Sequence, residues 1–194
     1  MRRVAVLPLF LLLSGCFKTS PPLVFHALAP LVQEEKPPAS PAPFALEMMP
    51  VLLPELLQRS QIVTRNGSNT LAILETHRWG NTLGKDMQRV VAENLCTLLG
   101  GPVVNYPFGE RVKAKFRVTL DVHRCDGQPG GNLQFHCTWM VTRWEDGQAV
   151  LVRDAIFQEA VVGRDPEILV AAHSRVLAAL SREVAVGIRS LKVD

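Results

Sequence analysis

The chain lacks a surplus of charge and a long apolar run. It carries 21 Lys and Arg residues against 18 Asp and Glu residues, a formal net charge of +3. A nearly neutral chain argues against a nucleic-acid-binding protein, which needs a basic face, and against a polybasic membrane patch. No apolar run reaches the roughly 20 residues of a transmembrane helix. We therefore expect a chain that binds no nucleic acid and does not cross a membrane.

Common catalytic motifs are also missing. The sequence contains no Gly-x-Ser-x-Gly elbow, no Gly-x-x-x-x-Gly-Lys phosphate loop and no His-Glu-x-x-His pair. His77, beside Arg78 and Trp79, favours a surface or packing role, and His173 on the last predicted helix favours a satisfied, half-buried side chain. We expect a protein that is not an enzyme and that holds neither a cofactor nor a metal.

The first residues have the pattern of a lipoprotein signal. Arg2 and Arg3 precede a short apolar run at 4–13, whose last two residues begin the sequence Leu-Leu-Ser-Gly-Cys at 12–16. This segment resembles a bacterial lipobox, in which diacylglycerol is joined to the cysteine thiol and a peptidase cuts before it. We predict a signal peptide at 1–15 and a tether at 16–22 that carries diacylglycerol and an N-acyl chain on Cys16. The alternative is an ordinary signal peptide with a coincidental cysteine.

Phe17 follows the predicted lipidation site, where an inner-membrane lipoprotein typically carries Asp. This residue favours the outer membrane, with the protein facing the periplasm. Removal of residues 1–15 takes away Arg2 and Arg3, which leaves a net charge of +1. Two or three acyl chains bind a membrane far more firmly than one chain, so we expect the lipid to be the anchor.

Residues 23–194 are predicted to form one α+β domain. Alternating patterns and turn residues predict strands at 23–28, 44–49, 60–65, 71–75, 102–106, 114–125, 133–144 and 149–159. A proline-rich loop occupies 34–43, and a single helical turn is expected at 53–57. Apolar residues at helical spacing predict helices over 83–99 and 166–188, the second capped by Asp165. We expect both helices to pack on one face of a largely antiparallel sheet.

Strand parity makes a specific prediction for two cysteines. Alternation pairs Val122 with Cys137 and His123 with His136, which leaves Cys125 on the polar face and Cys137 in the core. Cysteines on opposite faces do not meet the geometry of a disulfide, unless a β-bulge turns one of them over. We therefore expect free thiols.

The same register gathers His123, His136 and Cys125 on one face, a set that could bind zinc. A solvated polar face without metal is the expected state. Cys96, beside the apolar stripe of the first helix, is expected to be a small buried residue.

Several segments together resemble the ABC-type transport auxiliary lipoproteins, the PqiC or YmbA group. They are LPELLQRSQIVTR at 53–65, HRWG at 77–80, AENL at 92–95, VAA at 170–172 and LSREVA at 180–185, together with Trp139. The first strand departs from the family pattern, because His26 stands where members often show an aromatic residue in a Tyr-x-Leu pattern. The resemblance implies an outer-membrane lipoprotein that works with an inner-membrane-anchored MCE protein to move lipids or other apolar molecules.

The expected function is therefore a non-catalytic subunit of an MCE-type transport and envelope-integrity system. A homo-oligomer would match the rings that MCE proteins form. Arg78 and Trp79 are candidate partner-binding residues, because Arg and Trp are enriched at binding hot spots; the alternative is that Trp79 covers one end of the core. Two other functions stay open: a carrier that binds lipid between sheet and helices, and a lipoprotein that assists assembly of an outer-membrane component.

Overall fold

The computed structural model describes residues 21–31, 38–107 and 112–191. The elements in chain order are β1 (Val24–His26), β2 (Ala45–Met48), the 3-10 helix η1 (Glu55–Gln58), β3 (Gln61–Arg65), β4 (Leu71–Trp79), α1 (Leu83–Leu99), β5 (Val103–Asn105), β6 (Ala114–Gly127), β7 (Asn132–Arg143), β8 (Ala149–Ala160) and α2 (Pro166–Arg189). Every predicted element is present, and β4 runs on to include Trp79. The signal peptide and Cys16 lie outside the described residues.

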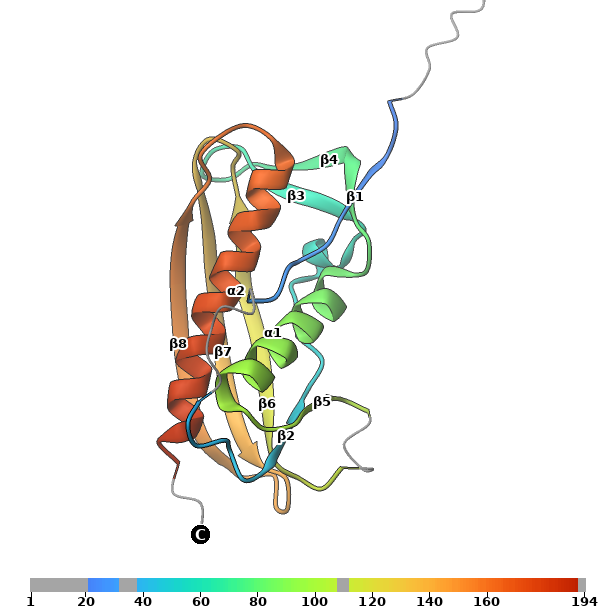
Figure 1. The fold of residues 1–194 in the computed structure, drawn as a ribbon. Helices are drawn as coiled ribbons and strands as arrows, with labels where there is room; N and C mark the ends of the chain where they lie inside the picture. The colour runs from blue at the N-terminus through green and yellow to red at the C-terminus, as the bar shows by residue number, and fades with distance from the viewer. Residues whose placement is uncertain (1–20, 32–37, 108–111, 192–194) are drawn as a thin grey trace, which may run out of the picture.

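The strands form two sheets. The larger has the order β5-β2-β6-β7-β8, in which β6, β7 and β8 form an antiparallel meander and β2 is parallel to both β5 and β6. The smaller has the order β1-β4-β3, with β1 parallel to β4. Both helices lie on the same face of the larger sheet (Figure 1). The predicted α+β class is confirmed. The parallel pairings made by the short strands β1, β2 and β5 were not part of the prediction.

The helix ends follow local chemistry. The Asp165 side chain accepts a hydrogen bond from the Glu167 N–H, and Pro166 opens α2, as predicted. Gly100 caps the end of α1 after Leu99, and its φ of 68° lies in the left-handed region that favours glycine. The proline-rich segment packs against this end, because the Ala42 N–H donates to the Leu99 carbonyl. None of the helices in the described part of the chain has the length and apolar character needed to cross a membrane.

A buried tryptophan marks the contact between α2 and the sheet. The Trp139 ring on β7 is fully buried, and its indole N–H donates to Glu183 of α2 at 2.9 Å. A Cβ atom placed on Gly187 would lie 2.6 Å from the Trp139 ring and 2.8 Å from Leu151. The helix therefore approaches β7 more closely than any other residue type at position 187 would allow.

An ion pair joins the two sheets. Asp126 on β6 accepts from Arg65 on β3 at 2.5 Å and from Arg124 at 3.2 Å. Burial alone raises the pKa of the Asp126 carboxyl, but the hydrogen bonds from the two guanidinium groups outweigh it and lower that pKa below its ordinary value. The carboxylate form is thus the one that the fold favours.

A β-bulge corrects the predicted register of β6 and β7. The pair Val122–Cys137 is confirmed and Leu120 lies opposite Trp139, but Arg124, not His123, pairs with His136 because the register shifts between Val122 and Arg124. The extra residue turns Cys125 inward, where it is 2% exposed.

The prediction that Cys125 lies on the polar face is therefore wrong. Both Cys125 and Cys137 belong to the core, and both are free thiols whose pKa burial raises. Cys125 lies opposite Phe135 and Cys137 opposite Val122, so the two are offset along the strands. Cys96 was also predicted incorrectly, because it is exposed on α1.

Candidate functional site

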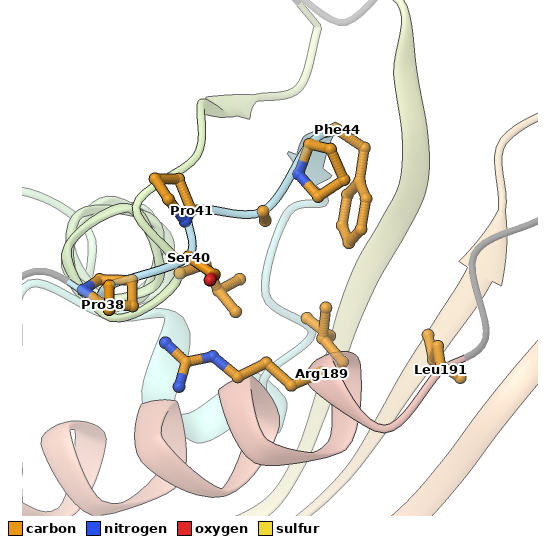
Figure 2. Close-up of a pocket in the computed structure, with 11 residues that line it drawn as sticks. Pro38, Ser40, Pro41, Phe44, Arg189 and Leu191 are labelled. Carbon is orange, nitrogen blue, oxygen red and sulfur yellow. The ribbon is translucent and has the colours of Figure 1, made fainter.

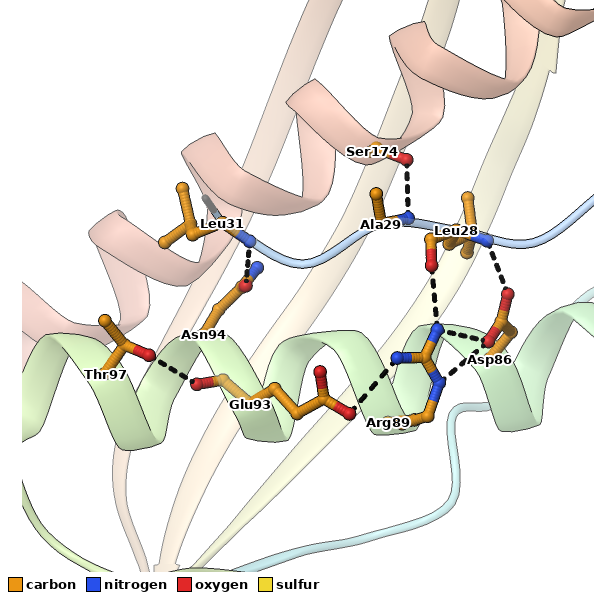
Figure 3. A network of polar contacts seen from close by, with 9 residues as sticks. All are labelled: Leu28, Ala29, Leu31, Asp86, Arg89, Glu93, Asn94, Thr97 and Ser174. Atoms are coloured by element: carbon orange, nitrogen blue, oxygen red, sulfur yellow. Dashed lines mark hydrogen bonds and ion pairs between the residues drawn. The ribbon is translucent and has the colours of Figure 1, made fainter. Parts of the chain in front are cut away.

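The segment that follows β1 lies between α1 and α2 (Figure 1). It leads from the predicted lipid-anchored tether into the folded body. The Leu28 side chain joins the hydrophobic core, whereas the backbone of residues 28–31 is bound by polar side chains of both helices (Figure 3). We call this arrangement the tether clamp: Asp86, Arg89, Asn94, Ser174 and Ser181 around residues 28–31.

Two residues of α1 bind both backbone groups of Leu28. The Leu28 N–H donates to Asp86 Oδ2 at 2.6 Å, and Arg89 Nη2 donates to the Leu28 carbonyl at 2.7 Å. Asp86 and Arg89 also form an ion pair at 2.7 Å, and they stand three residues apart, on the same face of α1. The pair therefore presents one acceptor and one donor to a single peptide strand.

The rest of the clamp connects the segment to α2. The Leu31 N–H donates to Asn94 Oδ1 at 2.7 Å, and the Ala29 N–H donates to the Ser174 hydroxyl at 3.0 Å. The Asn94 amide in turn donates to the Ser181 hydroxyl at 3.1 Å, and Ser181 donates to the Leu177 carbonyl. Each buried polar group thus has a partner, which is the condition for keeping such groups in a core.

Charge supports the same geometry. Burial lowers the pKa of Arg89, but hydrogen bonds to Asp86 and Glu93 more than offset that effect and raise it. The guanidinium group stays charged, and it can therefore serve three acceptors at once: Asp86, Glu93 and the Leu28 carbonyl.

Sequence reasoning missed the clamp, although a signal was present. Asp86 and Asn94 stand within the apolar stripe of α1, next to Met87 and Leu95, and are 3% and 1% exposed. A charged or amide side chain on a buried helix face needs a partner. The partner here is backbone from a segment more than fifty residues away in sequence, and the helix pattern alone does not identify it.

The two residues predicted to bind a partner lie at the end of β4, beside β1. Arg78 is in register with Phe25, and Trp79 with His26. Neighbouring residues of a strand point to opposite faces, so the two side chains do not form one surface. Trp79 is 5% exposed and belongs to the core, which agrees with the packing alternative. The Arg78 Nε atom is buried without a hydrogen-bond partner among the described residues.

Two histidine contacts lie next to Arg78 and Trp79. His26 and His77 stack with their ring centroids 5.2 Å apart and their nitrogens at 2.9 Å; burial, and then the His77 charge, lower the pKa of His26. His173 on α2 meets the Trp79 ring edge-on and its Nδ1 donates to the Leu169 carbonyl at 2.8 Å. His173 is satisfied, as predicted, but fully buried, and burial lowers its pKa to about 4.

A pocket of about 520 Å³ lies at the other end of α2 (Figure 2). Its wall consists of the proline-rich segment from Pro38 to Phe44, the end of α1 at Leu99, and Ile188. The Arg189 side chain crosses one side and donates to the Leu98 carbonyl. The volume lies within the range of small-molecule sites, and the pocket is formed between helix ends rather than between helix and sheet.

This geometry defines the protein as an α+β domain whose two helices hold the backbone of residues 28–31 by hydrogen bonds. The model of the family described as the ABC-type transport auxiliary lipoprotein component matches residues 26–185. The chain belongs to this family. The match runs from the last residue of β1 to within the last turns of α2, so it includes every residue of the tether clamp.

Solved structures show the same fold. A crystal structure of an uncharacterized protein has a TM-score of 0.71 at 18% identity and covers 87% of this chain and 99% of its own. Protein XCC0632 from Xanthomonas campestris has a TM-score of 0.66 at 13% identity, with coverage of 84% and 92%. The comparison with curated proteins found no match.

Proposed function

We propose that this protein is a non-catalytic, lipid-anchored subunit of an MCE-type transport system, held at the outer membrane and facing the periplasm. Cys16 carries the lipid, and the folded domain docks on an MCE protein anchored in the inner membrane. The family supports a transport-auxiliary role. The lipobox supports attachment to a membrane through a lipid, and Phe17 supports the outer membrane as its location. The transported molecule is a lipid or another apolar compound.

The tether clamp is the observation that carries this proposal. A lipid anchor positions a domain only if the chain next to the anchor is fixed to that domain. Here Leu28, Ala29 and Leu31 are hydrogen-bonded to both helices. The six residues from Phe17 to Pro22 reach roughly 20 Å when fully extended, so the domain stays close to the membrane.

Anchoring in two facing membranes favours docking of the domain on the MCE protein. Two proteins held on facing membranes meet at a raised effective concentration, so an interface of modest area suffices. Exposed apolar side chains lie at the start of β1 and just before it, at Leu23, Val24 and Phe25, the last 64% exposed. These residues lie just beyond the tether, where a membrane surface or a docked protein would cover them. A homo-oligomer would match the symmetry of an MCE ring.

The test compares two cysteine substitutions in the full-length precursor. Cys16→Ala removes the lipidation site and should release the protein from the outer-membrane fraction and abolish complementation of a deletion strain. Cys96→Ala removes an exposed thiol from α1 and should change neither. A Cys16→Ala protein that stays membrane-bound and fully active would show the tethering mechanism to be wrong.

Affinity purification of the tagged wild-type protein identifies the partner. An MCE protein among the captured proteins is the expected result. Capture of an outer-membrane β-barrel protein would favour a role in assembly, and lipid without protein would favour a carrier.

The carrier function has one specific observation in its favour, the pocket at Pro38, Leu99 and Ile188. Ala39→Asp places a charge at an exposed position of its wall and should abolish co-purification of lipid if the pocket binds it. Val186→Asp, at an exposed position of α2 outside this pocket, is the matched control. Equal lipid content in both variants would exclude this pocket as the carrier site.

A further inference from the structure

We propose a zinc-binding site on the face of the larger sheet that the helices leave uncovered, formed by His123, His136 and Asp154. One ligand atom from each side chain lies within 4.8 Å of the others. The three residues come from β6, β7 and β8 respectively. The site is independent of the lipid anchor and of the proposed docking function.

The β-bulge creates this cluster. Because the register shifts between Val122 and Arg124, His123 has no direct partner on β7, and His136 pairs with Arg124 instead. The His123 and His136 rings then meet edge-on, with centroids 4.9 Å apart. Cys125, which the predicted register placed in this group, turns into the core, and Asp154 takes the third position.

Thr138 fixes the tautomer of His123. Its hydroxyl lies 2.6 Å from Asp154 Oδ1 and 2.8 Å from His123 Nε2. A carboxylate only accepts, so the hydroxyl donates to Asp154 and accepts from the Nε2–H of His123. The lone pair of His123 then resides on Nδ1, the form in which a neutral imidazole coordinates a metal. A ligand histidine whose second N–H is held by a neighbour is the usual arrangement in metal sites.

The donor set selects the type of ion. Two imidazoles and one carboxylate suit Zn²⁺, whereas Ca²⁺ and Mg²⁺ prefer oxygen ligands alone. Three protein ligands leave the fourth tetrahedral position for water or for a ligand from another molecule. Ligand atoms around zinc are roughly 3.3 Å apart, given zinc–ligand distances of about 2 Å. His123 and Asp154 are exposed, so their side chains can close the remaining gap by rotation.

Local charge favours a cation. Asp121 on β6 and Asp154 on β8 both lie opposite Thr138 in the strand register, so carboxylates flank the central strand on both sides. The nearest guanidinium in sequence, Arg124, is engaged by Asp126. A bound Zn²⁺ would join three adjacent strands.

The test is a zinc titration of the full-length lipidated protein, purified in detergent without a histidine tag, against a chromogenic chelator. One zinc ion per chain is expected. His123→Ala, His136→Ala and Asp154→Asn should each weaken the affinity at least tenfold, and Thr138→Ala, which removes a positioning contact, by about tenfold. His77→Ala, which alters the other histidine pair, is the control and should leave the affinity unchanged.

Zinc-dependent thermal stability provides a second readout. Zinc should raise the unfolding temperature of the wild type and of His77→Ala, but not that of His123→Ala or Asp154→Asn. These exposed substitutions should leave the zinc-free unfolding temperature nearly unchanged. Lack of stoichiometric binding at micromolar zinc, or equal affinity in the wild type and the ligand variants, would overturn the proposal.

Discussion

Helix α2 makes two contacts of opposite character. Against β7 it is close and mostly apolar, with Gly187 over the Trp139 ring and one hydrogen bond, from the Trp139 indole to Glu183. On the side that faces α1 it is polar: Ser174 accepts from the Ala29 N–H, and Ser181 accepts from the Asn94 amide. Apolar burial is strong but has no direction. Hydrogen bonds contribute little net stability but fix one geometry, because a misplaced buried group goes unpaired. The first contact therefore holds the helix, and the second holds one segment in one register.

The largest expected effect breaks the apolar contact. Trp139→Ala removes a fully buried ring and should lower the free energy of unfolding by about 3–5 kcal/mol, measured by urea denaturation. Trp144→Ala, which removes a partly exposed ring that Arg117 stacks on, should lower it by about 1 kcal/mol. Equal losses in the two variants would contradict the conclusion that the contact with Trp139 holds α2 on the sheet.

An intermediate effect is expected in the clamp. Asp86→Ala leaves the Leu28 N–H unpaired and removes a partner of Arg89. The free energy of unfolding should fall by about 2 kcal/mol, since the guanidinium keeps some contact with water. The distinctive result is faster hydrogen exchange at the Leu28 and Leu31 amides. Glu93→Ala removes an exposed partner of the same arginine and should leave that exchange unchanged; protected amides in Asp86→Ala would show that the clamp does not hold the segment.

The third prediction concerns the pH dependence of stability that His173 of α2 causes. Burial lowers the pKa of His173 to about 4. As the pH falls, His173 is therefore protonated near pH 6.5 in the unfolded chain but stays neutral at that pH in the folded chain. Stability from this residue is complete above pH 6.5 and is lost as pH falls toward 4. Between pH 7 and pH 5 the wild type should therefore lose about 2 kcal/mol more than His173→Phe. Parallel pH profiles in urea denaturation would contradict this assignment.

Most of the regular structure could be predicted because its causes are local. The apolar stripe of α1, the Asp165 cap with Pro166, and the turns of the β6–β8 meander all appear as short-range patterns. Lipidation of Cys16 stays a prediction, because that residue lies outside the described part of the chain.

The remaining features depend on contacts between distant residues. A bulge adds one residue to β6 without altering its alternation before Val122, so the sequence does not reveal that Cys125 turns inward. The parallel pairing of β1 with β4 and the clamp join segments more than fifty residues apart. The position of Asp86 and Asn94 on an apolar helix face indicates that each needs a hydrogen-bond partner. It does not identify that partner as the backbone of residues 28–31.

The pairing of β1 with β4 also has a mechanical consequence. The two strands run in the same direction, and the chain leaves β1 toward the tether from its first residue, Val24. A pull directed along β1 from the membrane side loads the interstrand hydrogen bonds in shear, so that they must fail together rather than one after another. The clamp bonds at Leu28, Ala29 and Leu31 lie farther from the point of loading. With the proposed lipid anchor at Cys16, its thermal motion would load the edge of the smaller sheet first and the hydrogen bonds between the helices and residues 28–31 only afterwards.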